Sequence, residues 1–399
     1  MPGVTRGLAP FVGVSFIYLL IMAATTVPTP LYPFYQQRMH FSLFMGTVIF
    51  AIYVVGVLAG LLGFGRWSDA LGRRPMLGAA VVMGLISTVC MLASDVFPSY
   101  GLPILLVGRL FVGLAVGLFV GAATAALIEL APPAIADKAP FISTAVNVLG
   151  LGSGPLLAGV MMETVPPPLR SVYWVLLAGL LIAALIVWRM PETVSVKPGA
   201  RPQAQSFSLP AGVSGPFIQA AVPGFAGFAA LGLFGAVSPD LMRQMGIADA
   251  IEQGLVIFAV FAASCIAQLV VKPLPLARTM VAGCAILTLG AAVLLLSVLF
   301  ESWVLLLAGG VISGAGQGAT FAKGLAHVSG AVADTERAGV TSVLFVCFYL
   351  GLTVPAVGVG ALALEWGLTN AAAAFAVVMM VLAAGAWAIN RSSLAPSTR

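Results

Sequence analysis

Long apolar runs follow one another along the whole chain, and each is long enough to cross a lipid bilayer as one helix. About 20 residues of α-helix span the roughly 30 Å of hydrocarbon in a membrane. A window of that length predicts twelve spans, which constrain the fold more than any other feature. Their approximate ranges are 9–32, 43–64, 76–94, 103–128, 139–160, 171–190, 216–237, 252–271, 279–299, 303–323, 339–360 and 368–389.

The composition is that of a chain that lies mostly in lipid. Hydrophobic residues make up 61% and charged residues 8%, against about 45–50% and about 25% in a soluble domain. We therefore expect an all-α polytopic membrane protein. Arg6 ahead of the first run is also compatible with a signal peptide, but the later runs favour a retained first helix. Four cysteines lie in four different runs without the spacing of a metal site, so no metal and no cofactor is expected.

Basic residues predict the orientation of the helices, because Lys and Arg favour cytoplasmic loops. With the N-terminus inside, 14 of the 18 basic residues fall on the cytoplasmic side. Arg38, Arg170 and Arg243 fall outside, and Arg109 lies within a span. Both termini are then cytoplasmic, and the membrane is the plasma membrane, which is the inner membrane in a bacterium. This asymmetry accounts for the net charge of +5 without a nucleic-acid partner, and we expect a monomer in the lipid bilayer.

The longest polar interval divides the spans into two sets of six. We expect an N-terminal half at 1–190, a cytoplasmic linker at 191–215 and a C-terminal half at 216–399. The halves resemble each other weakly in the placement of small residues and proline. The matching sets are Gly113, Gly117 and Gly121 with Gly310, Gly314 and Gly318, and Pro155 and Gly159 with Pro355 and Gly358. Two halves repeated in parallel are a transporter architecture; coincidence is the alternative, since membrane helices are rich in glycine.

The stretch GRWSDALGRR, from Gly65 to Arg74, places a cluster of charge between the second and third spans. Gly65 and Gly72 suit the sharp turns of a short connection. Asp69 can face the amide-rich start of a helix and can pair with Arg73. Such contacts, made in one conformation only, would act as a conformational latch. The alternative is a topology anchor, in which the arginines only hold the loop inside.

These residues fit the pattern GxxxDxxGRR, and through it the chain resembles the major facilitator superfamily. Further motifs lie in the order in which that family has them: Arg109 and Gly113 as RxxxG, Gly150, Gly154, Pro155 and Gly159 as GxxxGPxxGG with Ala158 in place of one glycine, and Pro191, Glu192 and Thr193 as PET. The resemblance implies a twelve-helix transporter. It also implies that Gly65, Asp69, Gly72, Arg73 and Arg74 tie the halves together on the cytoplasmic side, with Glu129 in the same charge network.

Two spans carry residues with further functional interpretations. Arg109 is charged at every accessible pH, so its place inside a span suggests a function, which in the family is proton or substrate coupling. The alternative is a side chain that extends to the outer interface. The fifth-span motif is associated with exporters in the family, and it could equally serve packing alone, as could Gly113 and Gly117.

Polar residues inside the spans are candidates for substrate contact or coupling. They are Thr25, Thr26, Asn147, Gln219, Gln268 and Gln317. Lining an otherwise apolar cavity, they would suit a neutral or amphipathic solute. No Asp or Glu lies near the middle of any span, although many proton-coupled exporters of the family have an acid in the first helix. Facilitated diffusion, or coupling through Glu129, Asp95 or Glu252, therefore stays open.

Together these features predict a secondary active transporter that works by alternating access and exports a small amphipathic compound or drug in exchange for protons. An uptake carrier or facilitator for a small organic solute is the alternative. A membrane enzyme finds no motif: there is no HExxH and no serine elbow, and GAGQGA at 314–319 has no strand before it. We therefore expect no catalytic residue.

Overall fold

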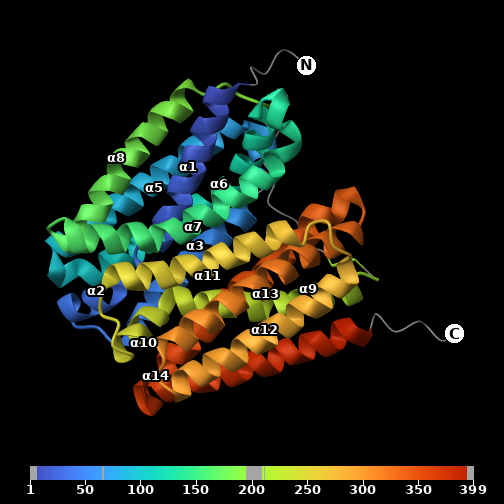
Figure 1. Ribbon diagram of the computed structural model, residues 1–399. Coiled ribbons are helices and arrows are strands. Elements are labelled where there is room, and N and C mark those ends of the chain that lie inside the picture. Colours follow the sequence, from blue (N-terminus) through green and yellow to red (C-terminus); the bar gives the residue numbers. More distant parts are fainter. Residues whose placement is uncertain (1–6, 65–66, 195–208, 211, 393–399) are drawn as a thin grey trace. The chain divides into compact units, whose positions relative to one another are not determined.

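The computed structural model describes residues 7–64, 67–194, 209–210 and 212–392, and within these ranges all regular structure is helical (Figure 1). The first long helices are α1 (Leu8–Thr26), α3 (Leu43–Phe64), α5 (Arg73–Val96), α6 (Gly101–Leu130), α7 (Ala139–Thr164) and α8 (Pro168–Arg189). They are followed by α9 (Ser214–Ala236), α11 (Ala250–Val270), α12 (Leu276–Leu299), α13 (Trp303–Gly330) and α14 (Asp334–Ser392). Short helices between them are η1 (Thr29–Leu31), α2 (Tyr32–Met39), α4 (Trp67–Leu71), η2 (Pro98–Tyr100), η3 (Pro133–Lys138) and α10 (Ser238–Gln244).

Eleven helical stretches of the described residues are long and apolar enough to cross a membrane. The last of them joins two of the predicted spans, 339–360 and 368–389, into α14. Gly367 stands between these two, with a φ of 77° that is not helical. The all-helical fold expected from the apolar runs is confirmed.

The first predicted span, 9–32, lies within one apolar helical stretch, Leu8–Met39, but it is not one continuous helix, because α1 ends at Thr26. Pro28, Pro30 and Pro33 follow it, and each lacks the N–H that a continuing helix would need. The chain instead forms η1 and then α2, which ends at Met39 and is followed by His40 with a φ of 57°.

The chain divides into two compact units, one of residues 1–40 and 49–205 and the other of residues 41–48 and 206–399. In the first unit, α1 packs against α6, α7 and α8, and α5 packs against α6 and α8. In the second unit, α9 packs against α13 and α14, and α12 packs against α13 and α14. The same partnerships therefore recur in the same chain order.

Glycines on α6 and α13 bring helix backbones close together in each unit. A Cβ added to Gly113 would lie 2.9 Å from the Cα of Gly56 on α3, and one on Gly117 would lie 2.7 Å from the Cα of Gly60. On α13, a Cβ added to Gly318 would lie 3.0 Å from the Cα of Ser264 on α11. These distances are too short for a side chain, so glycine is what allows the helices to touch. Gly121 differs, because a Cβ there would meet no described atom within 4 Å.

Candidate functional site

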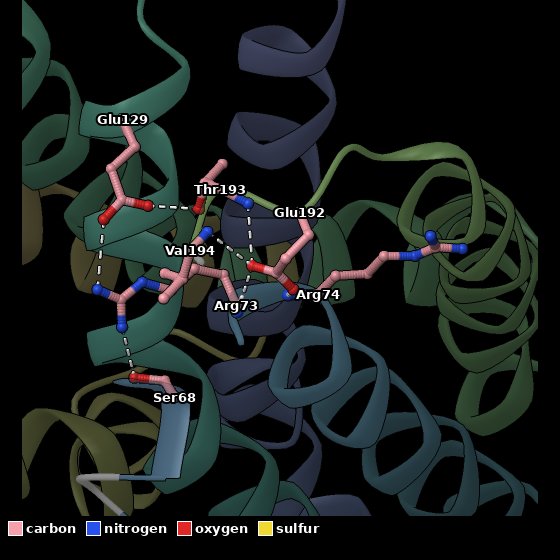
Figure 2. Close-up of polar contacts among 7 residues, drawn as sticks. All are labelled: Ser68, Arg73, Arg74, Glu129, Glu192, Thr193 and Val194. Atoms are coloured by element: carbon pink, nitrogen blue, oxygen red, sulfur yellow. Dashed lines mark hydrogen bonds and ion pairs between the residues drawn. The ribbon is translucent and has the colours of Figure 1, made fainter. Parts of the chain in front are cut away.

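The start of α5 is held by a carboxylate from far along the chain. Its N-cap, Gly72, offers no side chain, so the first amides of the helix need another acceptor. Glu192, just after α8, supplies it: the amides of Arg73 and Arg74 donate to its two carboxylate oxygens at 2.8 and 3.0 Å (Figure 2). A negative charge at a helix N-terminus is also favoured by the helix dipole.

The same carboxylate orders its own segment. The amides of Thr193 and Val194 donate to Glu192 at 2.9 and 3.2 Å, so four backbone N–H groups converge on one side chain. Gly72 makes room for it. Its φ is 104°, and a Cβ at this position would overlap the Glu192 carboxylate. Glycine is therefore required here for two independent reasons.

The Arg73 side chain joins this cap to two more elements. Its guanidinium donates to the Ser68 hydroxyl on α4 at 2.7 Å and to the Glu129 carboxylate at the end of α6 at 3.3 Å. The Thr193 hydroxyl donates to the other oxygen of Glu129. Figure 2 shows these residues as one connected cluster, which we call the Glu192 network: Ser68, Arg73, Arg74, Glu129, Glu192, Thr193 and Val194.

The predicted latch residues are only partly brought together. Arg73 and Glu129 lie in the Glu192 network, and Gly72 borders its carboxylate. Arg74 joins the network through its backbone amide only, and its side chain leaves α5 in the opposite direction from that of Arg73 (Figure 2). Gly65 lies outside the described residues. The backbone of Asp69 belongs to α4, but its side chain also lies outside what is described. The position that the sequence suggested for Asp69, facing a helix start, is occupied at α5 by Glu192.

Sequence reasoning missed Ser68 and the central role of Glu192. The one available signal was the PET stretch at Pro191, Glu192 and Thr193, which only the resemblance singled out. No local pattern could reveal that an acid at this position caps a helix that starts more than a hundred residues earlier.

Arg109 lies deep inside the first unit. Its side chain is 1% exposed, so it does not extend to the outer interface. One guanidinium nitrogen donates to the Thr25 carbonyl at 2.7 Å, and the group stacks over the Tyr53 ring at 4.8 Å from its centroid. The Nε has no hydrogen-bond partner, and no carboxylate pairs with Arg109 within the described residues. A buried cation that is held only by a carbonyl and an aromatic face lacks a counter-ion in the described part of the chain. The arrival of an anion or the movement of a proton nearby would therefore change its electrostatic energy strongly.

The fifth-span motif shapes the contact between α7 and α1. Pro155 has no N–H to donate to the Leu151 carbonyl one turn earlier. The Thr26 hydroxyl, on α1, donates to that carbonyl at 2.7 Å. Gly150 and Gly154 border the same contact, because a Cβ on either would crowd α1 backbone atoms, and Gly159 is buried. Pro223 on α9 frees the Gln219 carbonyl in the same way, and Asn390 on α14 donates to it at 3.2 Å.

The other polar candidates fall into separate contacts. Gln317 accepts a hydrogen bond from Ser264 at 2.5 Å, and Gln268 donates to the same hydroxyl at 3.2 Å, so both lie on one α11–α13 contact. The Gln219 side chain lies 2.9 Å from the His327 ring nitrogen. Thr25 donates to the Met22 carbonyl in its own helix. Asn147 is half-buried and makes no hydrogen bond to the described residues.

The carboxylates considered for coupling differ in their surroundings. Asp95, at the far end of α5 from Glu192, is 5% exposed. It is paired with Arg38 at 3.0 Å and Arg170 at 2.5 Å, which ties α2, α5 and α8 together. Glu252 is exposed in the first turn of α11. Among the described residues, no group of three or more His, Cys, Asp or Glu side chains is placed to hold a metal ion.

Comparison with known proteins decides the family. The profile of the Major Facilitator Superfamily matches residues 14–274 and, in a second match, residues 220–398. The chain belongs to the Major Facilitator Superfamily. It is therefore an integral membrane transporter of that fold.

Individual relatives of this superfamily member are distant. A facilitated glucose transporter homolog from Caenorhabditis elegans is 30% identical over 122 residues, which are 28% of this chain and only 23% of that protein. Among solved structures, a POT family transporter in complex with 5-aminolevulinic acid has a TM-score of 0.74 at 13% identity and covers 98% of this chain and 97% of its own. A bacterial homolog of the human lysosomal transporter Spinster has a TM-score of 0.70 at 16% identity, with 97% and 98% covered. The human organic anion transporter MFSD10 has a TM-score of 0.67 at 17% identity, with 95% and 98% covered. At these identities the likeness is one of fold.

Proposed function

We propose that this transporter works by alternating access and exports a small amphipathic organic compound in exchange for protons. We also place it in the plasma membrane, the inner membrane in a bacterium, as a monomer with both termini in the cytoplasm. The observation that carries the export proposal is the α1–α7 contact. The proline–glycine motif there resembles that of exporters, and its helix has a backbone carbonyl satisfied by a partner helix, so α7 can bend without leaving a polar group unpaired.

The substrate class rests on an aromatic cluster in the second unit. Phe228, Phe321 and Phe345 are half-buried around Phe348, and the Phe228 and Phe348 rings stack at 5.0 Å. Partly exposed aromatic rings suit a flat or amphipathic solute. Gln317 and Gln268 are the polar groups proposed to orient such a solute, and Arg109 the group proposed to couple its movement to protons or to its charge.

The Glu192 network is proposed as the first unit's part of the conformational latch. Its hydrogen bonds fix the start of α5, the end of α6 and the segment after α8 relative to one another. A conformational change that alters this end of the unit must break several of these bonds together. Each is worth about 1 kcal/mol, and ~1.4 kcal/mol changes a population ratio tenfold.

The test is transport by inside-out membrane vesicles with a panel of amphipathic dyes and drugs. Imposing a proton gradient should drive uptake of at least one compound into the vesicles, and a protonophore should abolish it. Vesicles with Arg109→Ala protein, checked for equal expression and insertion, serve as the matched control. Uptake that persists with the protonophore would contradict proton exchange and leave facilitated export.

An uptake carrier or facilitator for a small organic solute such as a sugar is the second candidate. Two observations favour it: the 122-residue match to a facilitated glucose transporter homolog, and the absence of any Asp or Glu from the middle of the predicted spans. In intact cells this candidate predicts faster accumulation of a labelled sugar or metabolite on expression, whereas the exporter predicts lower accumulation of a toxic compound.

A further inference from the structure

Two apolar grooves flank the end of α8 that is predicted to be cytoplasmic. One lies between α5 and α8, has a volume of about 580 Å³ and is walled by Val81, Val82, Ala184, Val187 and Trp188. Arg74 and Glu192 stand at its end. The other lies between α1 and α8, has a volume of about 430 Å³ and carries Arg189. Both belong to the first unit.

The two arginines at these grooves differ from Arg73 in having no carboxylate partner among the described residues. The Arg74 guanidinium donates to the Trp188 carbonyl and makes no ion pair within the described residues. Arg189 stacks over the Trp188 ring at 5.9 Å and likewise has no described ion pair. Figure 2 shows the Arg74 guanidinium turned away from the carboxylates of Glu192 and Glu129. Around Trp188, two positive charges are therefore left without an ion-pair partner in the part of the chain that the structure describes.

Glu192 also borders the first groove, but its carboxylate binds backbone amides and not the Arg74 side chain. Its carboxylate accepts four backbone N–H groups, two of them from the positive end of the α5 dipole. It forms no ion pair with the Arg74 guanidinium within the described residues. An anion approaching Arg74 from the groove would meet N–H donors that the protein leaves unused, since a guanidinium carries five.

The groove walls identify the rest of the ligand. Val82 is 49% exposed, Trp188 is 67% exposed, and Leu181 and Leu185 on the same helix are more than half exposed. These residues lie on membrane-spanning helices, so hydrocarbon is what covers them. A cation at the headgroup level above an apolar groove, with a tryptophan beside it, combines the features that bind a charged lipid.

We propose that the α5–α8 groove binds an anionic phospholipid, with the phosphate on Arg74 and an acyl chain against Val82, Val187 and Trp188. Arg189 adds positive field from the other side of Trp188. The two consecutive arginines would then have separate partners: Arg73 binds protein carboxylate and Arg74 binds lipid phosphate. This inference does not depend on which solute is transported.

Native mass spectrometry of delipidated protein tests it, with phosphatidylglycerol and phosphatidylcholine of identical acyl chains. Phosphatidylglycerol should bind more tightly. Arg74→Gln should weaken it about fivefold, the equivalent of ~1 kcal/mol for one basic residue, and should leave phosphatidylcholine unchanged. Arg74→Lys should retain most of the binding. Arg337→Gln is the matched control, because that guanidinium already donates to the Ser329 carbonyl in the second unit.

Three results would overturn the proposal. Equal binding of the two lipids would remove the role of charge. An equal loss in Arg337→Gln would mean diffuse attraction to the whole basic surface. Competition by glycerophosphoglycerol, which has the headgroup without the chains, at the same concentration as the lipid would mean a free-anion site. Phosphatidylglycerol with brominated acyl chains tests where the acyl chain lies. It should quench the tryptophan fluorescence of the wild-type protein more than that of the Trp188→Phe protein.

Discussion

At the scale of single residues, Gly72 and Glu192 depend on each other. The backbone at Gly72 has a φ of 104°, which residues with a side chain rarely adopt, and the space where a Cβ would stand is filled by the Glu192 carboxylate. A substitution at Gly72 therefore combines backbone strain with displacement of the group that caps α5. The Glu192 carboxylate in turn could move away from a Cβ only by losing some of the hydrogen bonds that it accepts from four backbone amides.

Gly72→Ala should lower the apparent melting temperature of the purified protein by more than backbone strain alone would lower it. A residue with a Cβ held in the sparsely populated conformation of Gly72 costs about 1–3 kcal/mol. Gly246→Ala is the matched control, since Gly246 has a φ of 90° but open space around it. Equal losses of stability in the two variants would show that the contact with Glu192 contributes nothing.

Removal of the Glu192 carboxylate should loosen the first turn of α5. In Glu192→Ala protein the amides of Arg73 and Arg74 lose their acceptors, so their hydrogen exchange should become faster, by about fivefold for each ~1 kcal/mol of cap energy lost. Glu192→Gln, which keeps one oxygen but no charge, should fall between Ala and wild type. Unchanged exchange in the Ala variant would refute the cap.

At the scale of helices, the recurring device is a proline whose freed carbonyl is bonded from another helix. Pro155 and Thr26 form one case on α7 and α1, and Pro223 and Asn390 form the other on α9 and α14. In lipid no water is available for such a carbonyl, so the partner helix must supply the donor. Thr26, predicted as a coupling or substrate residue, thus has a structural bond that accounts for its hydroxyl.

Thr26→Val keeps the side-chain shape and removes the donor to Leu151. The expected loss of unfolding free energy is ~1 kcal/mol, the usual size of a hydrogen bond between membrane helices, visible as a lower melting temperature. Thr26→Ser should retain stability. Thr144→Val is the matched control, because the Thr144 hydroxyl bonds only a carbonyl of its own helix. In a Pro155→Ala background, Thr26→Val should cost clearly less; an equal cost would disprove the pairing.

At the scale of the whole chain, the two units repeat one set of helix partnerships, and the charged loop belongs to the first of them. An alternating-access cycle needs states that differ little in free energy, so a few bonds made in one state can set the balance. The described contacts of Arg73 with Glu129 and Ser68 supply such bonds on the first unit. The latch proposal adds Asp69, whose charge would be lost in an Asn variant of the same volume.

Asp69→Asn should shift the population toward the inward-open state and slow transport. A bias of ~1–2 kcal/mol corresponds to a five- to thirtyfold change in the ratio of the two states. Distances between spin labels on the cytoplasmic ends of the two halves should lengthen on average, and Arg73→Gln should act in the same direction. Arg337→Gln should leave the distances unchanged. If Asp69→Asn behaves like that control, with normal insertion and transport, the loop is a topology anchor.

Sequence alone predicted the spans well, because hydrophobic length dictates membrane helices almost residue by residue; α3 begins and ends where its run does. It failed where the signal is not local. The prolines after Thr26 were visible, yet the apolar run concealed the early end of α1. The Glu192 cap, the Arg109 contact with Tyr53 and the bond from Thr26 to Leu151 each join positions far apart in the chain. Such contacts depend on how the helices of the unit pack, and the hydrophobic pattern of the sequence does not specify this packing.

The bonded carbonyls of Leu151 and Gln219 also limit how this sequence can vary among its descendants. While proline stands at position 155, position 26 should be confined to Ser or Thr, and once proline is lost, apolar residues should become acceptable there. Asn390 should be tied to Pro223 by the same rule. In a randomised library, selected only for transport, the frequencies at the two positions of each pair should be statistically dependent. Such a dependence would show that the amide hydrogen missing at each proline restricts which residues evolution accepts at the partner position.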